Sequence, residues 1–147
     1  MKLLKIESSQ IPHASKISKT HWMINSDYEV RMITDEGTLV FRMKAGWITD
    51  FRSGSSVVDC IVPKVGNRLY CATILCHDMA YSGHITKALA DELLYHGMVL
   101  SGQSKFLAGL AYRAVRMFGG TGYYHLDDKM AKPYTRNRIL ERFEWTS

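Results

Sequence analysis

Residues 28–43, YEVRMITDEGTLVFRM, decide the fold of the N-terminal half. Segments 28–34 and 38–43 are rich in β-branched and aromatic residues, which favour extended backbone. Between them, the residues DEG at 35–37 place a glycine where a tight turn needs a positive φ. The stretch therefore predicts an antiparallel β-hairpin, and the segment 46–50 predicts a third extended piece close behind it.

Helices are predicted after this sheet. Their expected spans are residues 68–82, 87–100 and 105–118. The first is the continuous, mostly apolar run RLYCATILCHDMAYS. Thr86 and Ser104 are placed to cap the second and third, because their hydroxyls accept a hydrogen bond from the free N–H groups at a helix start. The sequence predicts an α+β fold: a small antiparallel sheet in the N-terminal half, followed by three main helices packed on it.

The chain of 147 residues has room for one hydrophobic core, and we expect one domain over residues 1–147. Residues 121–147 form a C-terminal extension in this interpretation, with a short helix over 135–143. The content of 46% hydrophobic and 22% charged residues excludes a wholly disordered chain. No apolar run approaches the roughly 18–20 residues of a membrane span, and the short apolar start predicts a cytoplasmic protein without a signal peptide.

Positive charge is concentrated in the C-terminal third. Residues 101–147 contain 8 Lys and Arg against 4 Asp and Glu. Such an excess favours an anionic partner, which could be a nucleotide, a phospholipid or nucleic acid. The alternative is a basic face that is merely solvated.

A His-Asp pair lies within the first predicted helix. His77 and Asp78 have apolar neighbours on nearly every side. Adjacent helical residues point about 100° apart, so the two side chains do not pair with each other and each needs its own buried partner. Tyr81 follows His77 by four residues, so its hydroxyl is expected at the edge of the same pocket.

Two further acids are candidates for that pocket. Asp50 ends a predicted strand, and Asp91 lies on the second predicted helix. If the first two helices form an antiparallel hairpin, Asp78 and Asp91 lie at similar depth. The four groups would then supply a base, an acid or metal ligands. Alternatively, Asp50 only caps the following loop, and Asp91 is a carboxylate in the first turn of its helix that the helix dipole stabilises. His77 would then be a core histidine that hydrogen-bonds a buried backbone group.

Several spaced motifs over residues 45–120 resemble a phage-encoded family known as domain of unknown function number thirteen fifty-three. The matching positions are Thr49-Asp50, Ser53 and Ser55, His77-Asp78-Tyr81, Ala90-Asp91, and Tyr112-Ala114-Val115-Arg116. The loop FRSG at 51–54 departs from the shorter Gly-Ala-Ser type of that family. The resemblance implies a phage setting, in the host cytoplasm or in the virion, and it implies no reaction.

The motif HDMAY at 77–81 is also similar to the His-Asp-x-x-Tyr helix of secreted phospholipases A2. That resemblance implies that His77 activates water, Asp78 binds calcium, and Tyr81 helps to hold an acid on a neighbouring helix, here Asp91. The glycine-rich calcium loop and the disulfides of those enzymes are absent from this sequence.

The first functional hypothesis is a metal-assisted hydrolase of ester or phosphoester substrates. His77 would be the general base, and Asp78 with Asp50 or Asp91 would bind a divalent cation, Ca²⁺ or Mg²⁺, or orient His77. Tyr81 or Arg116 would hold the substrate anion, as would Ser53 and Ser55.

The second hypothesis involves no chemistry. The protein would be a phage virion or tail component, or a counter-defence protein that binds a host nucleotide or a host protein. The polar cluster would then fix the packing or bind a ligand, and the basic C-terminal third would make the contact.

Overall fold

The computed structural model describes residues 1–10, 12–17, 21–49, 68–118 and 139–147. A four-stranded antiparallel sheet has the order β1-β4-β5-β7, formed by β1 (Leu3–Ser8), β4 (Tyr28–Thr34), β5 (Thr38–Met43) and β7 (Glu141–Thr146). A smaller sheet has the order β2-β3-β6, formed by β2 (Ala14–Lys16), β3 (Trp22–Ile24) and β6 (Ile48–Thr49). The helices are α2 (Arg68–Ala80), α3 (Lys87–Leu100) and α4 (Lys105–Phe118). The predicted α+β class is confirmed.

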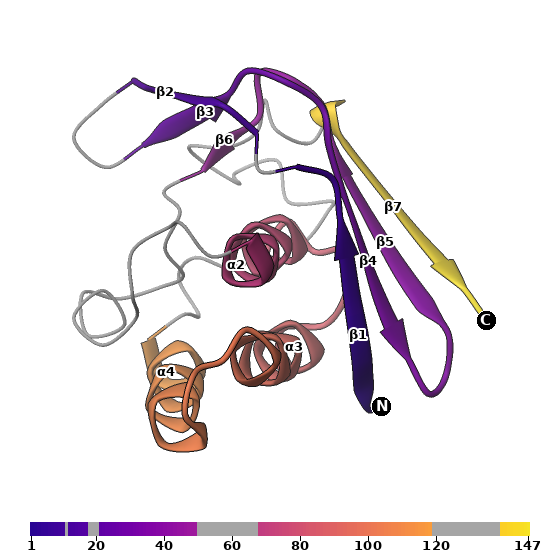
Figure 1. Cartoon of the computed structure of the whole chain (residues 1–147), viewed down its shortest axis with the longest axis vertical. Coiled ribbons are helices and arrows are strands. Elements are labelled where there is room, and N and C mark those ends of the chain that lie inside the picture. Colours follow the sequence, from indigo (N-terminus) through magenta and orange to yellow (C-terminus); the bar gives the residue numbers. More distant parts are fainter. Residues whose placement is uncertain (11, 18–20, 50–67, 119–138) are drawn as a thin grey trace.

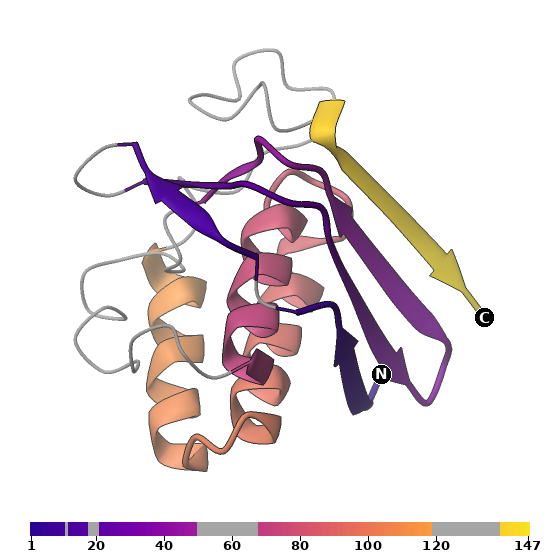
Figure 2. The same ribbon diagram turned by 45° about the horizontal axis from the view of Figure 1, so that its top comes forward.

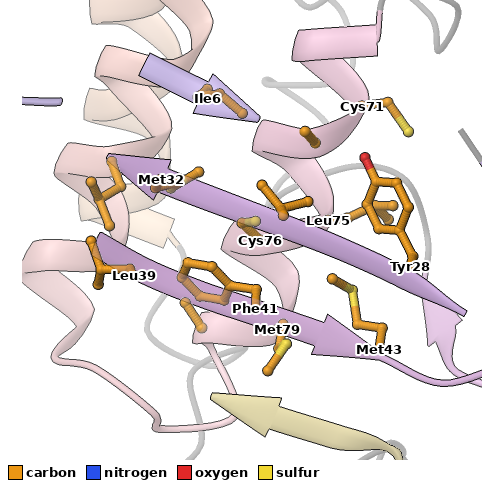
Figure 3. Packing of buried hydrophobic residues seen from close by; sticks show 14 of the residues in the cluster. Ile6, Tyr28, Met32, Leu39, Phe41, Met43, Cys71, Leu75, Cys76 and Met79 are labelled. Atoms are coloured by element: carbon orange, nitrogen blue, oxygen red, sulfur yellow. The ribbon is translucent and has the colours of Figure 1, made fainter. Parts of the chain in front are cut away.

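Helices α2 and α3 lie against one face of the larger sheet, and α4 lies beyond them on the side away from the sheet (Figures 1 and 2). Side chains of β4, β5 and α2 meet in the main core, including Met32, Phe41, Leu75 and Met79 (Figure 3). A second cluster joins α2, α3 and α4. Helix α2 is consequently buried on nearly all sides, which explains its continuous apolar sequence.

The predicted hairpin is confirmed by the pairing of β4 with β5, which continues up to Ile33 opposite Thr38. Gly37 in the turn has a φ of 150°. A Cβ atom at this position would lie 2.5 Å from the carbonyl oxygen of Thr146 and 2.9 Å from Cα of Ser147. The glycine is therefore required by the close approach of the C-terminal strand as well as by the turn.

The short helix predicted over residues 135–143 is wrong at residues 141–143, because Glu141–Thr146 form the edge strand β7; residues 135–138 lie outside the described part of the chain. The strand pairs with β5 along its whole length. The rings of Phe41 and Phe143 lie 5.2 Å apart across this pairing. Pairing with the exposed edge of β5 outweighs the local helical tendency of the segment.

Both predicted N-caps are confirmed. The backbone N–H of Leu89 donates to Oγ1 of Thr86 (3.2 Å), and that of Leu107 donates to Oγ of Ser104 (3.1 Å).

Within the described residues, no helix combines the length and apolar character needed to cross a bilayer.

Helices α2 and α3 approach each other closely at Gly97, which predicts a large effect of adding one methyl group there. A Cβ atom at Gly97 would lie 2.6 Å from Cγ2 of Thr73, on the facing helix. We expect Gly97→Ala to lower the free energy of unfolding by about 1–3 kcal/mol, since overpacking forces the helices apart. Urea denaturation measures this.

Gly109 on α4 provides the matched control, because no atom lies within 4 Å of a Cβ built there. Gly109→Ala should raise the free energy of unfolding, by up to about 1 kcal/mol, through helix propensity alone. Equal effects of the two substitutions on the free energy of unfolding would show that the close approach of Gly97 to Thr73 does not restrict the side chain at position 97.

Candidate active site

His77 and Tyr81 lie one helical turn apart and face the same side of α2. Tyr81 directly follows the helix in a turn, and its N–H still donates to the carbonyl oxygen of His77 (3.1 Å). The two ring centroids are 4.2 Å apart. Both side chains point toward α3, where Asp91 is completely buried.

Asp91 joins α2 to α3 through one carboxylate oxygen. Nε2 of His77 lies 2.9 Å from Oδ1 of Asp91, and the hydroxyl of Tyr81 donates to the same oxygen (2.5 Å). Tyr81 therefore shares its partner with His77, as the spacing of four residues on one helix face favours. The structure also confirms that His77 finds its partner elsewhere than on Asp78.

The other carboxylate oxygen of Asp91 accepts from two cationic side chains. Nζ of Lys87, one turn earlier on α3, lies 2.8 Å from Oδ2 and also donates to the carbonyl oxygen of Val115 (2.8 Å). A terminal guanidinium nitrogen of Arg116 on α4 lies 3.2 Å from Oδ2. Three helices therefore meet at one buried carboxylate, which we call the Asp91 cluster (His77, Tyr81, Lys87, Asp91 and Arg116).

The cluster fixes the charge of both central groups. Burial raises the pKa of Asp91, but hydrogen bonds from His77, Lys87 and Tyr81 outweigh that effect and lower the pKa to about 2. Burial lowers the pKa of His77, although Asp91 acts in the opposite direction. At neutral pH, Asp91 is ionised and His77 is neutral. Because a carboxylate only accepts, Nε2 carries the proton and the lone pair of the ring is on Nδ1.

Asp78 occupies a different environment from Asp91. Its side chain is half-buried, and Oδ2 accepts a hydrogen bond from the hydroxyl of Thr49 at the end of β6. The expectation that Asp78 and Asp91 lie at similar depth is therefore wrong. The two acids project from helices that face each other, but Asp78 turns toward the smaller sheet because it lies about 100° around α2 from His77.

Three predicted site residues, Asp50, Ser53 and Ser55, lie outside the described residues. Arg116, expected from the sequence to hold a substrate anion, contacts the carboxylate of Asp91 through one guanidinium nitrogen. Among the residues that the structure describes, no group of three or more His, Cys, Asp or Glu side chains is arranged to hold a metal ion.

Sequence reasoning missed Lys87 and a second buried carboxylate, Glu141. The i, i+4 spacing of Lys87 and Asp91 was the available signal for the first. Glu141 accepts from Nε1 of Trp47 (2.8 Å) and the hydroxyl of Ser82 (3.1 Å), and Nε2 of His84 lies 2.8 Å from its other oxygen. These contacts fasten β7 to the turn after α2 and so support the C-terminal end of the helix that carries His77.

A family model described as "Protein of unknown function (DUF1353)" matches residues 22–115. The match begins earlier than the 45–120 expected from the motifs, so it includes the β4–β5 hairpin as well as His77, Tyr81, Lys87 and Asp91 of the cluster, and it ends one residue before Arg116. No curated protein matches the chain, and no solved structure matches it either.

Proposed function

Because the chain belongs to the DUF1353 family, whose description assigns no reaction, we propose a function from the site itself: hydrolysis of an ester or phosphoester, with His77 as the general base. The observation that carries this proposal is the buried His77 ring held through Nε2 by the fully buried carboxylate of Asp91; the lowered pKa of both groups supports it. A general base must be unprotonated at the working pH, and it operates best when its pKa lies near that pH and its orientation is fixed.

In the proposed reaction, Nδ1 of His77 takes a proton from a water molecule that attacks the ester carbon or phosphorus. Asp91 then stabilises the imidazolium that forms, through its bond to Nε2. The same ring returns the proton to the oxygen of the leaving alcohol. Asp91 and Tyr81 act as positioning residues, because they fix the tautomer and the orientation of the ring.

Asp78 is the described side chain that fits a divalent cation. Its oxygen ligands suit Ca²⁺ or Mg²⁺, and Thr49 already orients one of its carboxylate oxygens. Asp50, the residue after Thr49 in the sequence, would be the second ligand. A bound cation would supply stabilisation of the negative charge that develops on the substrate.

Arg116 would orient an anionic substrate in this proposal. One guanidinium nitrogen binds Asp91, while the side chain is 40% exposed. Ser53 and Ser55, which follow Asp50 in the sequence, are proposed to contact the substrate. The phage setting implied by the motifs is part of the proposal, with the enzyme acting in the host cytoplasm or from the virion.

The experiment that tests the proposal is a hydrolysis screen with 4-nitrophenyl butyrate, bis(4-nitrophenyl) phosphate and a phospholipid, each with Ca²⁺, Mg²⁺ or a chelator. We expect turnover of at least one ester that needs a cation and falls about 100-fold in Asp78→Asn. Glu92→Gln is the control, since Glu92 is an exposed acid on α3. If chelator and the Asp78→Asn substitution both leave the activity of the wild-type protein with cation unchanged, the cation is removed from the proposal.

A second candidate, ligand binding without chemistry, is favoured by the exposed fractions of the His77 and Asp91 side chains, which are 1% and 0%. In that case the cluster fixes the packing of a phage structural or counter-defence protein. Absence of turnover with every substrate, in a wild-type protein shown to be folded, would select this candidate.

A further inference from the structure

The outer face of α4 exposes large apolar side chains that the packing of the fold does not use. Phe106 is 74% exposed and Met117 is 73% exposed. The inner face of the same helix is occupied by Ala108, Ala111 and Val115, which pack in the core cluster shared with α2 and α3. The apolar residues outside are therefore not required for the attachment of α4.

These exposed residues form one stripe along the helix. Phe106, Arg113 and Met117 are spaced by seven and four residues, so they lie within about 40° of each other around the axis. The half-buried Leu110 lies beside them. At about 1.5 Å per residue, the stripe from Phe106 to Met117 is about 16 Å long.

The charge of α4 is entirely positive. Lys105 and Arg113 are exposed, Arg116 is partly exposed, and no Asp or Glu occurs between residues 105 and 118. Of the three helices that the structure describes, α4 is also the most amphipathic. Among the described elements it lies farthest from the larger sheet, with α2 and α3 between them (Figure 2).

We propose that the outer face of α4, defined by Phe106, Leu110, Arg113 and Met117, binds an anionic phospholipid surface, with the exposed Lys105 at the start of the helix. Exposed aromatic and thioether side chains enter the boundary between headgroups and acyl chains, while Lys and Arg contact the phosphates. A lipid surface fits this face better than a protein partner, because an arginine interrupts the apolar stripe, whereas the centre of a protein interface is depleted of charge.

The binding surface does not depend on the proposed hydrolysis, although it shares a helix with the candidate site. Arg116 of α4 contacts Asp91, so a membrane bound at this helix lies near the Asp91 cluster. Membrane binding is measured without any hydrolysis, so failure of the binding test and failure of the hydrolysis test are distinguishable.

The test is co-sedimentation of the full chain with vesicles of phosphatidylcholine alone and of phosphatidylcholine with about one third phosphatidylglycerol. We expect binding to the anionic vesicles only, weakened by salt and unaffected by millimolar inorganic phosphate. The double substitution Phe106→Ser/Met117→Ser should lower the partition coefficient at least about tenfold. Arg113→Gln should lower it less.

Leu4→Ser is the matched control, because Leu4 on β1 is 50% exposed and belongs to a different face. It should bind as the wild type does, and so should His77→Gln. The proposal is overturned if wild-type protein does not bind anionic vesicles. It is equally overturned if the double variant binds unchanged, or if inorganic phosphate abolishes binding, which would indicate a site for a free anion.

Discussion

Replacement of Asp91 by Ala is expected to lower the free energy of unfolding by about 3–5 kcal/mol, the range for breaking a buried charge network by removal of one partner. The carboxylate is completely buried and accepts from His77, Tyr81, Lys87 and Arg116. Its removal leaves the partly buried Lys87 ammonium without its counter-charge. Urea denaturation at pH 7 measures the loss.

The pH dependence of this loss follows from the pKa of Asp91. That pKa is about 2 in the folded protein, below the ordinary value of 3.8. The ionised carboxylate therefore stabilises the fold above about pH 4, and this contribution is lost as the pH falls toward 2. The difference between wild type and Asp91→Ala should shrink over that interval.

Glu92→Gln removes an exposed acid at the adjacent position of α3 and is the control for this prediction. It should change stability by less than about 0.5 kcal/mol. If Asp91→Ala were as stable as Glu92→Gln at pH 7, the four contacts to Asp91 would not contribute to folding.

His77→Gln is expected to lower the hydrolytic rate by about 10²–10⁴-fold, which is the usual contribution of a general base. A glutamine amide can still donate toward Oδ1 of Asp91, so the fold should remain, but it cannot take a proton from water. Steady-state kinetics on the best ester from the screen measure this, with circular dichroism as the check on folding.

Tyr81→Phe separates a positioning role from a catalytic one. It removes one donor to Asp91 and leaves the His77 bond in place. We expect a loss of about tenfold, with the acidic limb of the pH–rate profile displaced to higher pH, since the carboxylate without the Tyr81 donor stabilises the His77 imidazolium more strongly. For the His77→Gln prediction above, unchanged turnover in a folded variant would contradict the assignment of His77 as the general base.

Local signals predicted much of the fold. The turn at Gly37 and the hydroxyl caps at Thr86 and Ser104 are short-range features, and each appears in the structure where the sequence places it. Strand β7 could not be predicted in this way. Its conformation is determined by pairing with β5, which lies about a hundred residues earlier in the sequence. The local sequence of the segment, taken alone, predicts a helix.

The candidate site could also be predicted only in part, because local spacing determines some of its contacts and segments distant in the sequence determine the others. Helical spacing brought His77 and Tyr81 to one face, and the expected helix hairpin placed Asp91 opposite them. The depth of Asp78 depends on where β6 ends, which no local pattern of α2 records. Glu141 becomes buried only because β7 joins the sheet beside Trp47 and His84.

Proton-detected ¹⁵N NMR of the His77 ring tests the oriented base most directly, because it reports the tautomer and the pKa of a single imidazole. The account predicts a neutral ring protonated on Nε2 at pH 7, with a midpoint below the ordinary histidine value of 6.5. A ring that is charged at pH 7, or that carries its proton on Nδ1, would contradict the pairing of a neutral His77 with an ionised Asp91.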